Sequence, residues 1–214
     1  MIAAWITTEK GGPFNLAHPK AGDVDIEEIA ASLAKLCRFN GHSRYFYSVA
    51  QHSVLVSDML PPELRAYGLF HDAHKAYLGD LTTPIKDVLA RTFLEMLRDV
   101  GGCLDVTHSL PDPWGTMTDR VDVAIFRAVG LRWPPPVDVA RLVKHCDLVA
   151  LATERRDLLA EQSPPWTISL PAPLPRRLVP WAWDKAMDTF LDRARRLPIQ
   201  QARRGALVKE AGAC

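Results

Sequence analysis

The chain has 214 residues, of which 48% are hydrophobic and 24% are charged, and its formal net charge is +1. This composition is ordinary for a soluble globular protein. The small net charge gives no reason to expect a nucleic-acid-binding protein or a protein of acidic membrane surfaces. The N-terminal stretch MIAAWITTEKGG lacks the features of a signal peptide, and no apolar run approaches the length of a membrane span. The four cysteines contain no CxxC pair, so we expect a cytoplasmic protein with reduced thiols, although one structural disulfide stays open.

The first predicted elements are a small hairpin and a helix. Two short apolar runs, Trp5–Thr8 and Pro13–Leu16, flank the turn signal Lys10-Gly-Gly, which predicts an N-terminal hairpin. Helical periodicity begins at Asp25, an N-cap residue with a glutamate three residues later. We expect this helix to end in the segment 38–42, where Gly41 is a stop signal.

The rest of the chain reads as further helices. The second is predicted from about Ser48 to Leu60, and the third from Pro62 to Gly79. The remaining predictions are a turn at 82–86 into a short helix, helices at 91–109, 117–130, 137–161 and 181–196, a proline-rich surface excursion at 163–180, and a basic, mobile tail after Pro198. The fold class is therefore predicted to be all-α with a minor β element.

Four residues form a candidate metal site. His71 and Asp72 are adjacent, His52 lies on the preceding helix, and Asp147 lies in a later one. Imidazole nitrogen and carboxylate oxygen together suit first-row divalent metals. Neighbouring residues on a helix point about 100° apart, so His71 and Asp72 can share an ion only at a helix end or a distortion, which Gly79 makes plausible. The alternatives are a packed or capped His52 and an Asp147 that is paired with a lysine or arginine.

The motifs around these residues resemble a known family. The strings are Ser48-Val-Ala-Gln-His-Ser53, Leu69-Phe-His-Asp-Ala73, Leu78-Gly-Asp-Leu-Thr-Thr-Pro-Ile-Lys86 and Lys144-His-Cys-Asp-Leu148. They are similar to the HD-domain nucleotide phosphohydrolases, more narrowly to bacterial 5′-deoxynucleotidases, and most of all to phage-type dATP triphosphohydrolases, which share an Arg-Phe-Asn/Gly-Gly-His segment. The resemblance predicts an HD-domain helical bundle over residues 1–162. The excursion, last helix and tail of residues 163–214 would pack on this domain or trail from it.

The resemblance also implies roles for individual residues. The metal ligands would be the four residues named above. Arg38 would hold a phosphate, Phe39 would discriminate the sugar, and His42 would belong to the same substrate-binding segment. Asp80 would orient or deprotonate the attacking water, and Lys86 would meet a phosphate. The alternatives are a helix C-cap for Arg38, a turn residue for Asp80 and a solvated lysine for Lys86.

One position departs from the family pattern, because Lys75 stands where relatives carry a glutamate. A lysine is no general base at neutral pH without a large pKa depression. Three explanations stay open: Asp80 or His74 takes over proton transfer, Lys75 binds a phosphate, or activity is reduced. His74 is otherwise an exposed helix residue. Glu154 lies two turns after Asp147 on the same helix face, so it either contacts the surroundings of the metal ligands or pairs with Arg155 or Arg156, and we expect a surface salt bridge.

The function that follows is metal-dependent hydrolysis of deoxynucleotides by a dNTP triphosphohydrolase that releases deoxynucleoside and triphosphate. Alternatives are a 5′-deoxynucleotidase acting on dNMPs and a catalytically weak, metal-stapled nucleotide-binding module. The cofactor would be a divalent ion, with Co, Mn, Zn, Mg and Fe all open. The substrate would be a purine deoxynucleotide in a pocket walled by Trp5, Phe14 and Phe39. We further expect a dimer or hexamer without stable nucleic-acid or membrane binding, in the host cytoplasm if a phage encodes it.

Overall fold

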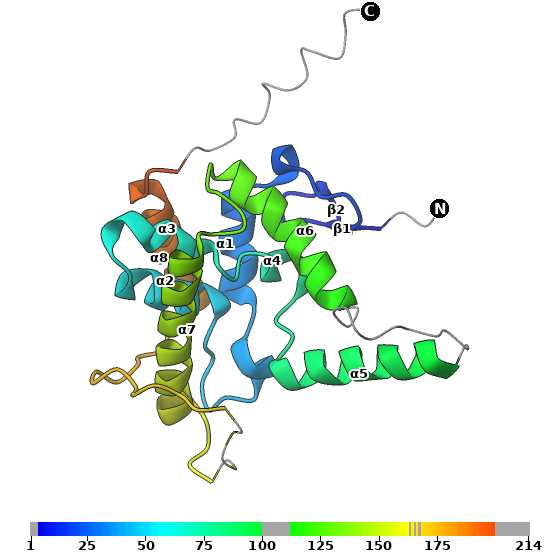
Figure 1. Cartoon of the computed structure of the whole chain (residues 1–214). Helices are drawn as coiled ribbons and strands as arrows, with labels where there is room; N and C mark the ends of the chain where they lie inside the picture. The colour runs from blue at the N-terminus through cyan, green and yellow to red at the C-terminus, as the bar shows by residue number, and fades with distance from the viewer. Residues whose placement is uncertain (1–3, 100–111, 163, 165, 167, 200–214) are drawn as a thin grey trace, which may run out of the picture.

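The computed structural model describes residues 4–99, 112–162, 164, 166 and 168–199. Over these ranges the regular structure is helical apart from one N-terminal hairpin, which confirms the predicted fold class (Figure 1). In chain order the elements are β1 (Trp5–Thr7), β2 (Pro13–Asn15), α1 (Ile26–Lys35), α2 (Val49–Met59), α3 (Arg65–Phe70), α4 (Lys75–Leu78), α5 (Thr83–Asp99), α6 (Pro113–Ala128), α7 (Val137–Leu158) and α8 (Trp183–Arg196), with short 3₁₀ turns at Ala21–Asp23, Arg38–Gly41 and Pro62–Leu64.

The hairpin pairs β1 with β2 in antiparallel register, with Ile6 opposite Phe14. Its turn closes through a hydrogen bond of 2.8 Å from the Thr8 N–H to the Gly12 carbonyl. The Phe14 ring is fully buried and stacks on Tyr77 of α4, with ring centroids 3.7 Å apart. This aromatic pair joins the hairpin to the helical body, and the polar contacts of Thr8 and Lys10 with the start of α1 join it as well.

Helix α1 begins where the sequence predicts, because the Asp25 carboxylate accepts hydrogen bonds from the Glu27 and Glu28 N–H groups. Its end differs from the prediction, since the helix stops at Lys35. The following residues instead pair with the chain before α2: the Arg38 N–H donates to the Tyr47 carbonyl at 2.9 Å. This pairing takes the backbone out of the helix before the glycine stop signal is reached.

The turn that follows Arg38 has an unusual backbone. Phe39, Asn40 and Gly41 have φ values of 56°, 51° and 78°, all in the left-handed region. This region costs a side chain about 1–2 kcal/mol per residue, so it persists only where the surroundings enforce it. The next segment is held by the end of α7, because the Arg44 N–H donates to the Leu158 carbonyl at 2.9 Å.

The predicted third helix is broken into two. Helix α3 ends at Phe70 and α4 begins at Lys75, with a turn over residues 71–74 between them. The His71–Asp72 pair therefore lies at a distortion, as two adjacent ligands require. Gly79, with φ 81°, then ends α4.

The last helix shares the main core. Phe190 of α8 is fully buried and meets the edge of Phe70, with ring centroids 5.8 Å apart. The Gln51 side chain on α2 also bonds the chain before α8, donating to the Val179 carbonyl at 2.8 Å and accepting from the Trp181 N–H at 2.9 Å. In Figure 1, α8 accordingly lies beside α1 and α2.

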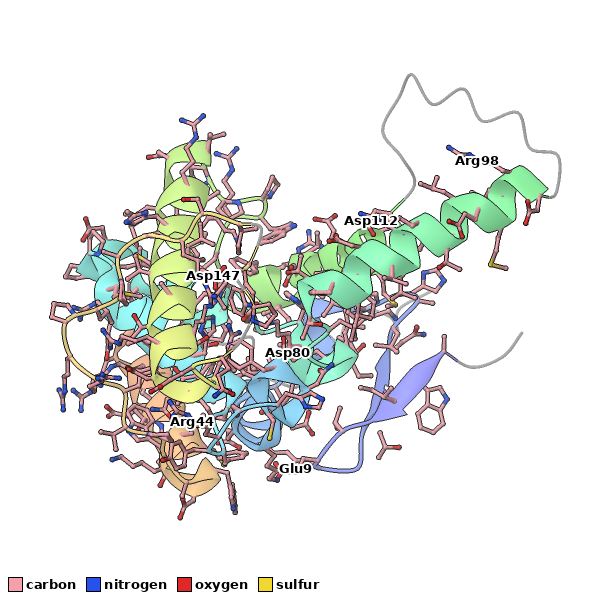
Figure 2. All side chains as sticks on the ribbon, turned by 90° about the horizontal axis from the view of Figure 1, so that it is seen from below. Glu9, Arg44, Asp80, Arg98, Asp112 and Asp147 are labelled. Carbon is pink, nitrogen blue, oxygen red and sulfur yellow. The ribbon has the colours of Figure 1, made fainter. Side chains whose placement is uncertain are left out.

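Helix α5 differs from its prediction. The turn at 82–86 and the helix at 91–109 merge into one helix, Thr83–Asp99, while 100–109 fall outside the described residues, as do the tail after residue 199, Cys103 and Cys214. No residue of α5 is buried, and the helix projects from the body, with Arg98 near its far end (Figures 1 and 2).

Helix α6 begins earlier than predicted because Asp112 caps it and Pro113 opens it. Among the described helices, none combines the length and apolar character needed to cross a membrane.

The proline-rich segment has no helix or strand over residues 168–182, and α7 anchors it. The Asp157 carboxylate accepts from Arg177 at 2.9 Å and from the Leu178 N–H at 2.9 Å. It also receives two hydrogen bonds of 2.8 Å from Arg156, whose guanidinium reaches the Leu174 carbonyl at 2.6 Å. These donors, Arg156 foremost, lower the pKa of Asp157 to about 2.

We expect Asp157→Asn to lower the free energy of unfolding by about 1–2 kcal/mol at pH 7. A carboxyl whose pKa is lower in the folded than in the unfolded chain stabilises the fold above its unfolded pKa near 4. That stabilisation is lost as the pH falls from about 4 to 2, so the deficit should shrink by about half near pH 3. Urea unfolding at both pH values measures it, with the exposed Asp188→Asn on α8 as control. A deficit that is independent of pH would contradict this origin.

Candidate metal centre

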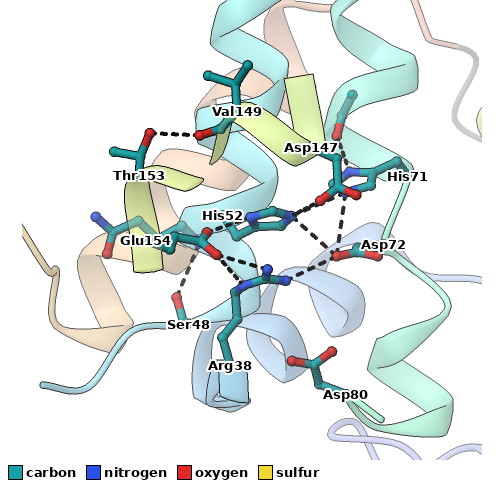
Figure 3. A network of polar contacts seen from close by, with 12 residues as sticks. Arg38, Ser48, His52, His71, Asp72, Asp80, Asp147, Val149, Thr153 and Glu154 are labelled. Atoms are coloured by element: carbon teal, nitrogen blue, oxygen red, sulfur yellow. Dashed lines mark hydrogen bonds and ion pairs between the residues drawn. The ribbon is translucent and has the colours of Figure 1, made fainter. Parts of the chain in front are cut away.

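Two histidine rings converge at the centre of the helical body. His52 on α2 is fully buried, and its Nε2 lies 3.3 Å from Nε2 of His71 (Figure 3). The other nitrogen of each ring has an acceptor: Nδ1 of His52 lies 2.6 Å from Glu154 Oε1, and Nδ1 of His71 lies 2.7 Å from the Gly68 carbonyl. These acceptors place the proton on Nδ1, so both Nε2 lone pairs face the same point. Two facing lone pairs at this distance repel each other unless a cation lies between them, and that cation can be a metal ion or a proton carried by one of the rings.

Asp72 completes a compact group with the two histidines. Its Oδ2 lies 3.5 Å from each Nε2. A tetrahedral ion with bonds of about 2.1 Å has ligand–ligand edges of about 3.4 Å, so the three atoms have the spacing that such an ion needs. This group of His52, His71 and Asp72 could hold a metal ion.

Asp147 on α7 is the fourth predicted ligand. Its Oδ1 lies 3.3 Å from Nε2 of His52, although it falls outside the compact group of three. Burial would raise the pKa of this carboxyl, but a protonated His52, which can donate from Nε2, and the charge of a protonated His71 together outweigh burial and lower the pKa. Asp147 also pairs with Lys144, one turn earlier, at 2.9 Å. The fold thus brings all four predicted ligands to one place, from α2, the turn after α3, and α7.

Glu154 corrects the prediction of a surface salt bridge. Its side chain is fully buried, and besides His52 it accepts hydrogen bonds from Arg38, whose Nε and terminal nitrogen lie 3.0 and 2.9 Å from Oε2. Burial would raise the pKa of Glu154, yet the charges of Arg38 and His52 and their hydrogen bonds together outweigh burial and lower the pKa. Arg156 pairs with Asp157 instead. The two-turn spacing from Asp147 correctly places Glu154 on the same face of α7. Because that face is buried, Glu154 contacts His52 and Arg38 instead of forming a surface salt bridge.

The predicted substrate-binding residues Arg38, Phe39 and His42 differ in burial and in their distance from the centre. The Arg38 guanidinium is buried, and besides Glu154 it lies 3.6 Å from Asp72 Oδ2. It therefore contacts the centre and is no cap of α1. Phe39 is half-buried, with the guanidinium 5.3 Å from its ring centroid. His42 is exposed, and among the described residues its side chain has no hydrogen bond or ion pair with the centre.

Lys75 is buried against two carboxylates. Its Nζ lies 2.8 Å from Asp72 Oδ2 and 2.6 Å from Asp80 Oδ1. Burial alone would lower the pKa of the ammonium, but the two carboxylates outweigh it and raise the pKa. Lys75 therefore stays charged at neutral pH and cannot be a general base. Its contact also brings Asp80 beside the centre, as Figure 3 shows.

His74 and Lys86 lie around the same site. His74 is buried, and its Nδ1 lies 3.1 Å from Oδ1 of Asp122 on α6, so the expectation of an exposed residue is wrong. Burial raises the pKa of Asp122. Lys86 is half-buried, and burial together with the charge of Lys75 lowers its pKa, which places it within electrostatic reach of the centre. Sequence reasoning missed Asp122, the partner of His74, whereas a lysine partner of Asp147 was one of its alternatives and Lys144 is that partner.

The predicted base pocket is not assembled. Phe14 belongs to the core through Tyr77, while Trp5 is half-exposed on the hairpin. Trp5 lines an open hollow of about 690 Å³ with His18 and other residues of the hairpin region, and neither Phe14 nor Phe39 contributes to it. These three aromatic residues thus form no common wall.

Two uncharacterized bacterial proteins are similar to this chain in sequence. No protein-family model matches it. YfdR, an uncharacterized protein of Escherichia coli, is 35% identical over 192 residues, which cover 89% of this chain and 93% of YfdR. An uncharacterized protein of Rhodobacter capsulatus is 29% identical over 167 residues, 74% of each chain. The chain therefore belongs to the family of Escherichia coli YfdR.

Proposed function

We propose that the chain is a metal-dependent phosphohydrolase that acts on deoxynucleoside triphosphates, with dATP as the first candidate. The observation that carries the proposal is the convergence of the His52 and His71 Nε2 atoms on Asp72 Oδ2, with each ring held from behind by an acceptor. Imidazole and carboxylate ligands in this arrangement suit a first-row divalent ion such as Mn²⁺, Co²⁺, Fe²⁺ or Zn²⁺.

The charges around the centre support a phosphate-bearing substrate. Arg38 and Lys75 are buried beside the ligands, Lys86 is half-buried, and Lys144 is 67% exposed at the rim. Guanidinium and ammonium groups are the side chains that bind phosphate oxygens. Two lysines beyond the buried pair favour a substrate with more than one phosphate.

A bound divalent ion would polarise a phosphoryl oxygen and lower the pKa of water, which is the chemistry that hydrolysis needs. In the proposed step a water oxygen bonds to the α-phosphorus, and the bond from that phosphorus to the sugar O5′ breaks. The Asp80 carboxylate accepts the proton of the water, and a proton reaches O5′ on departure. His52, His71, Asp72 and Asp147 would hold the ion, and Arg38 would face the developing negative charge.

With Mn²⁺ present, we expect the purified chain to convert dATP to deoxyadenosine and triphosphate, and EDTA to abolish turnover. Separate incubations with dATP and dAMP, analysed by chromatography and phosphorus NMR, measure both products. Re-addition of Mn²⁺ to the chelated sample is the control for irreversible damage. Consumption of dAMP alone, with release of inorganic phosphate, would identify a 5′-deoxynucleotidase instead.

One observation favours a second candidate, a catalytically weak nucleotide-binding module. The Lys75 ammonium lies 2.6 Å from the Asp80 carboxylate that the proposed step needs as a proton acceptor. This ion pair occupies an oxygen of the carboxylate that would have to accept the proton of the attacking water. Retained binding of dATP without turnover under any of the divalent ions would support this candidate.

A further inference from the structure

The position of Lys75 assigns it a role that the proposed hydrolysis does not by itself require. We propose that the Lys75 ammonium takes the place of a second metal ion, so that the centre binds one divalent ion per chain. This inference rests on the metal centre of the proposed function and adds its stoichiometry.

The Lys75 ammonium bridges two carboxylates, as a metal ion shared by two ligands does. Nζ lies 2.8 Å from Asp72 Oδ2 and 2.6 Å from Asp80 Oδ1. The same Asp72 oxygen faces both histidine Nε2 atoms at 3.5 Å. Asp72 thus contacts the candidate metal position and Lys75 through one oxygen. In centres with two metals, a second ion lies about 3.5–4 Å from the first, close enough for such sharing.

Apart from the exposed Lys144 and the half-buried Lys86, the charges around the ligand carboxylates balance with one divalent ion. The carboxylates of Asp72, Asp80 and Asp147 carry three negative charges, while Glu154 is already paired with Arg38. One divalent ion and Lys75 together supply three positive charges. A second divalent ion would leave two unmatched positive charges at a buried position, which is costly in a low-dielectric environment.

Burial keeps the ammonium in this place. The Lys75 side chain is 9% exposed, and its partners Asp72 and Asp80 are 13% and 8% exposed. Moving the ammonium aside would separate a buried charge from two carboxylates, which is energetically unfavourable. Lys144 offers a matched contrast, because it also pairs with a ligand carboxylate at 2.9 Å but is 67% exposed.

The test compares Mn²⁺ binding by the full-length chain and its variants. Equilibrium dialysis with elemental analysis gives the ions per chain, titration calorimetry gives the affinity, and electron paramagnetic resonance separates isolated from exchange-coupled Mn²⁺. We expect one uncoupled ion per wild-type chain. Lys75→Glu should bind two coupled ions, and Lys75→Met should bind its first ion about tenfold more tightly. Lys144→Gln should change the affinity by less than about threefold, because solvent screens its charge.

Two coupled ions in the wild-type chain, or a Lys75→Met chain with unchanged affinity, overturn the proposal. A Lys75→Glu chain that folds yet binds one ion does so too, and the wild-type and Lys75→Met measurements still decide if Lys75→Glu fails to fold. The outcomes also separate this inference from the proposed function. Two ions with dATP hydrolysis remove only the role of Lys75. One ion without hydrolysis removes only the activity, whereas no bound ion removes both.

Discussion

His71→Gln should weaken Mn²⁺ binding by more than about a hundredfold, and dATP hydrolysis should fall with it. Changes to residues that only orient a metal ligand cost 10–100-fold in affinity, so loss of a ligand nitrogen should cost more. His71 is a suitable position because it lies in a turn between α3 and α4 and its side chain is 13% exposed. Its replacement therefore disturbs packing less than replacement of the fully buried His52.

Calorimetric titration with Mn²⁺ and the dATP assay measure the two effects together. His145→Gln is the matched control, because His145 is an exposed histidine on α7, two residues before Asp147. Circular dichroism should show the same helix content in both variants. Binding and turnover that survive His71→Gln in a folded chain would remove His71 from the metal centre.

Glu154→Ala should lower the free energy of unfolding by about 3–5 kcal/mol, because it leaves the Arg38 charge buried without its main partner. It should also weaken Mn²⁺ binding about 10–100-fold, because His52 loses the acceptor that holds its ring. The 2.6 Å contact to His52 Nδ1 and the 2.9 Å contact to Arg38 make one carboxylate responsible for both effects.

The variant Glu154→Gln separates the two roles. Its amide oxygen can still accept from His52 Nδ1, but it carries no charge to compensate Arg38. We expect most of the stability loss and only a small loss of Mn²⁺ affinity. Urea unfolding without metal and calorimetric titration report them separately, with the exposed Glu161→Ala as control. If Glu154→Ala leaves both quantities unchanged, Glu154 supports neither His52 nor Arg38.

Part of the candidate metal site is visible in the sequence because it depends on local chemistry. His71 and Asp72 are adjacent, and a site shared by neighbours requires a distorted helix, which the turn over residues 71–74 provides. Asp25 and Ser48 likewise cap α1 and α2 through bonds to nearby N–H groups. Such contacts span only a few residues, so their pattern is visible in the sequence.

The features that sequence reasoning missed depend on contacts between distant elements. Helix α1 ends early because residues near Arg38 pair with the chain around Tyr47, which no helix propensity records. Glu154 lies on the predicted face of α7, but only its packing against α2 determines that it is buried and meets His52. The Lys75 substitution is visible in the sequence, whereas its contact with both Asp72 and Asp80 requires the fold.

The candidate ligands come from α2, the turn after α3, and α7, which are far apart along the chain. A bound ion would therefore act as a clamp on tertiary structure, and it would form only after the long-range packing of α7 is complete. Hydrogen exchange in α7 should then slow when Mn²⁺ is added, because opening this helix would first require release of the ion. Through Asp157, the same clamp would also hold the proline-rich segment in place.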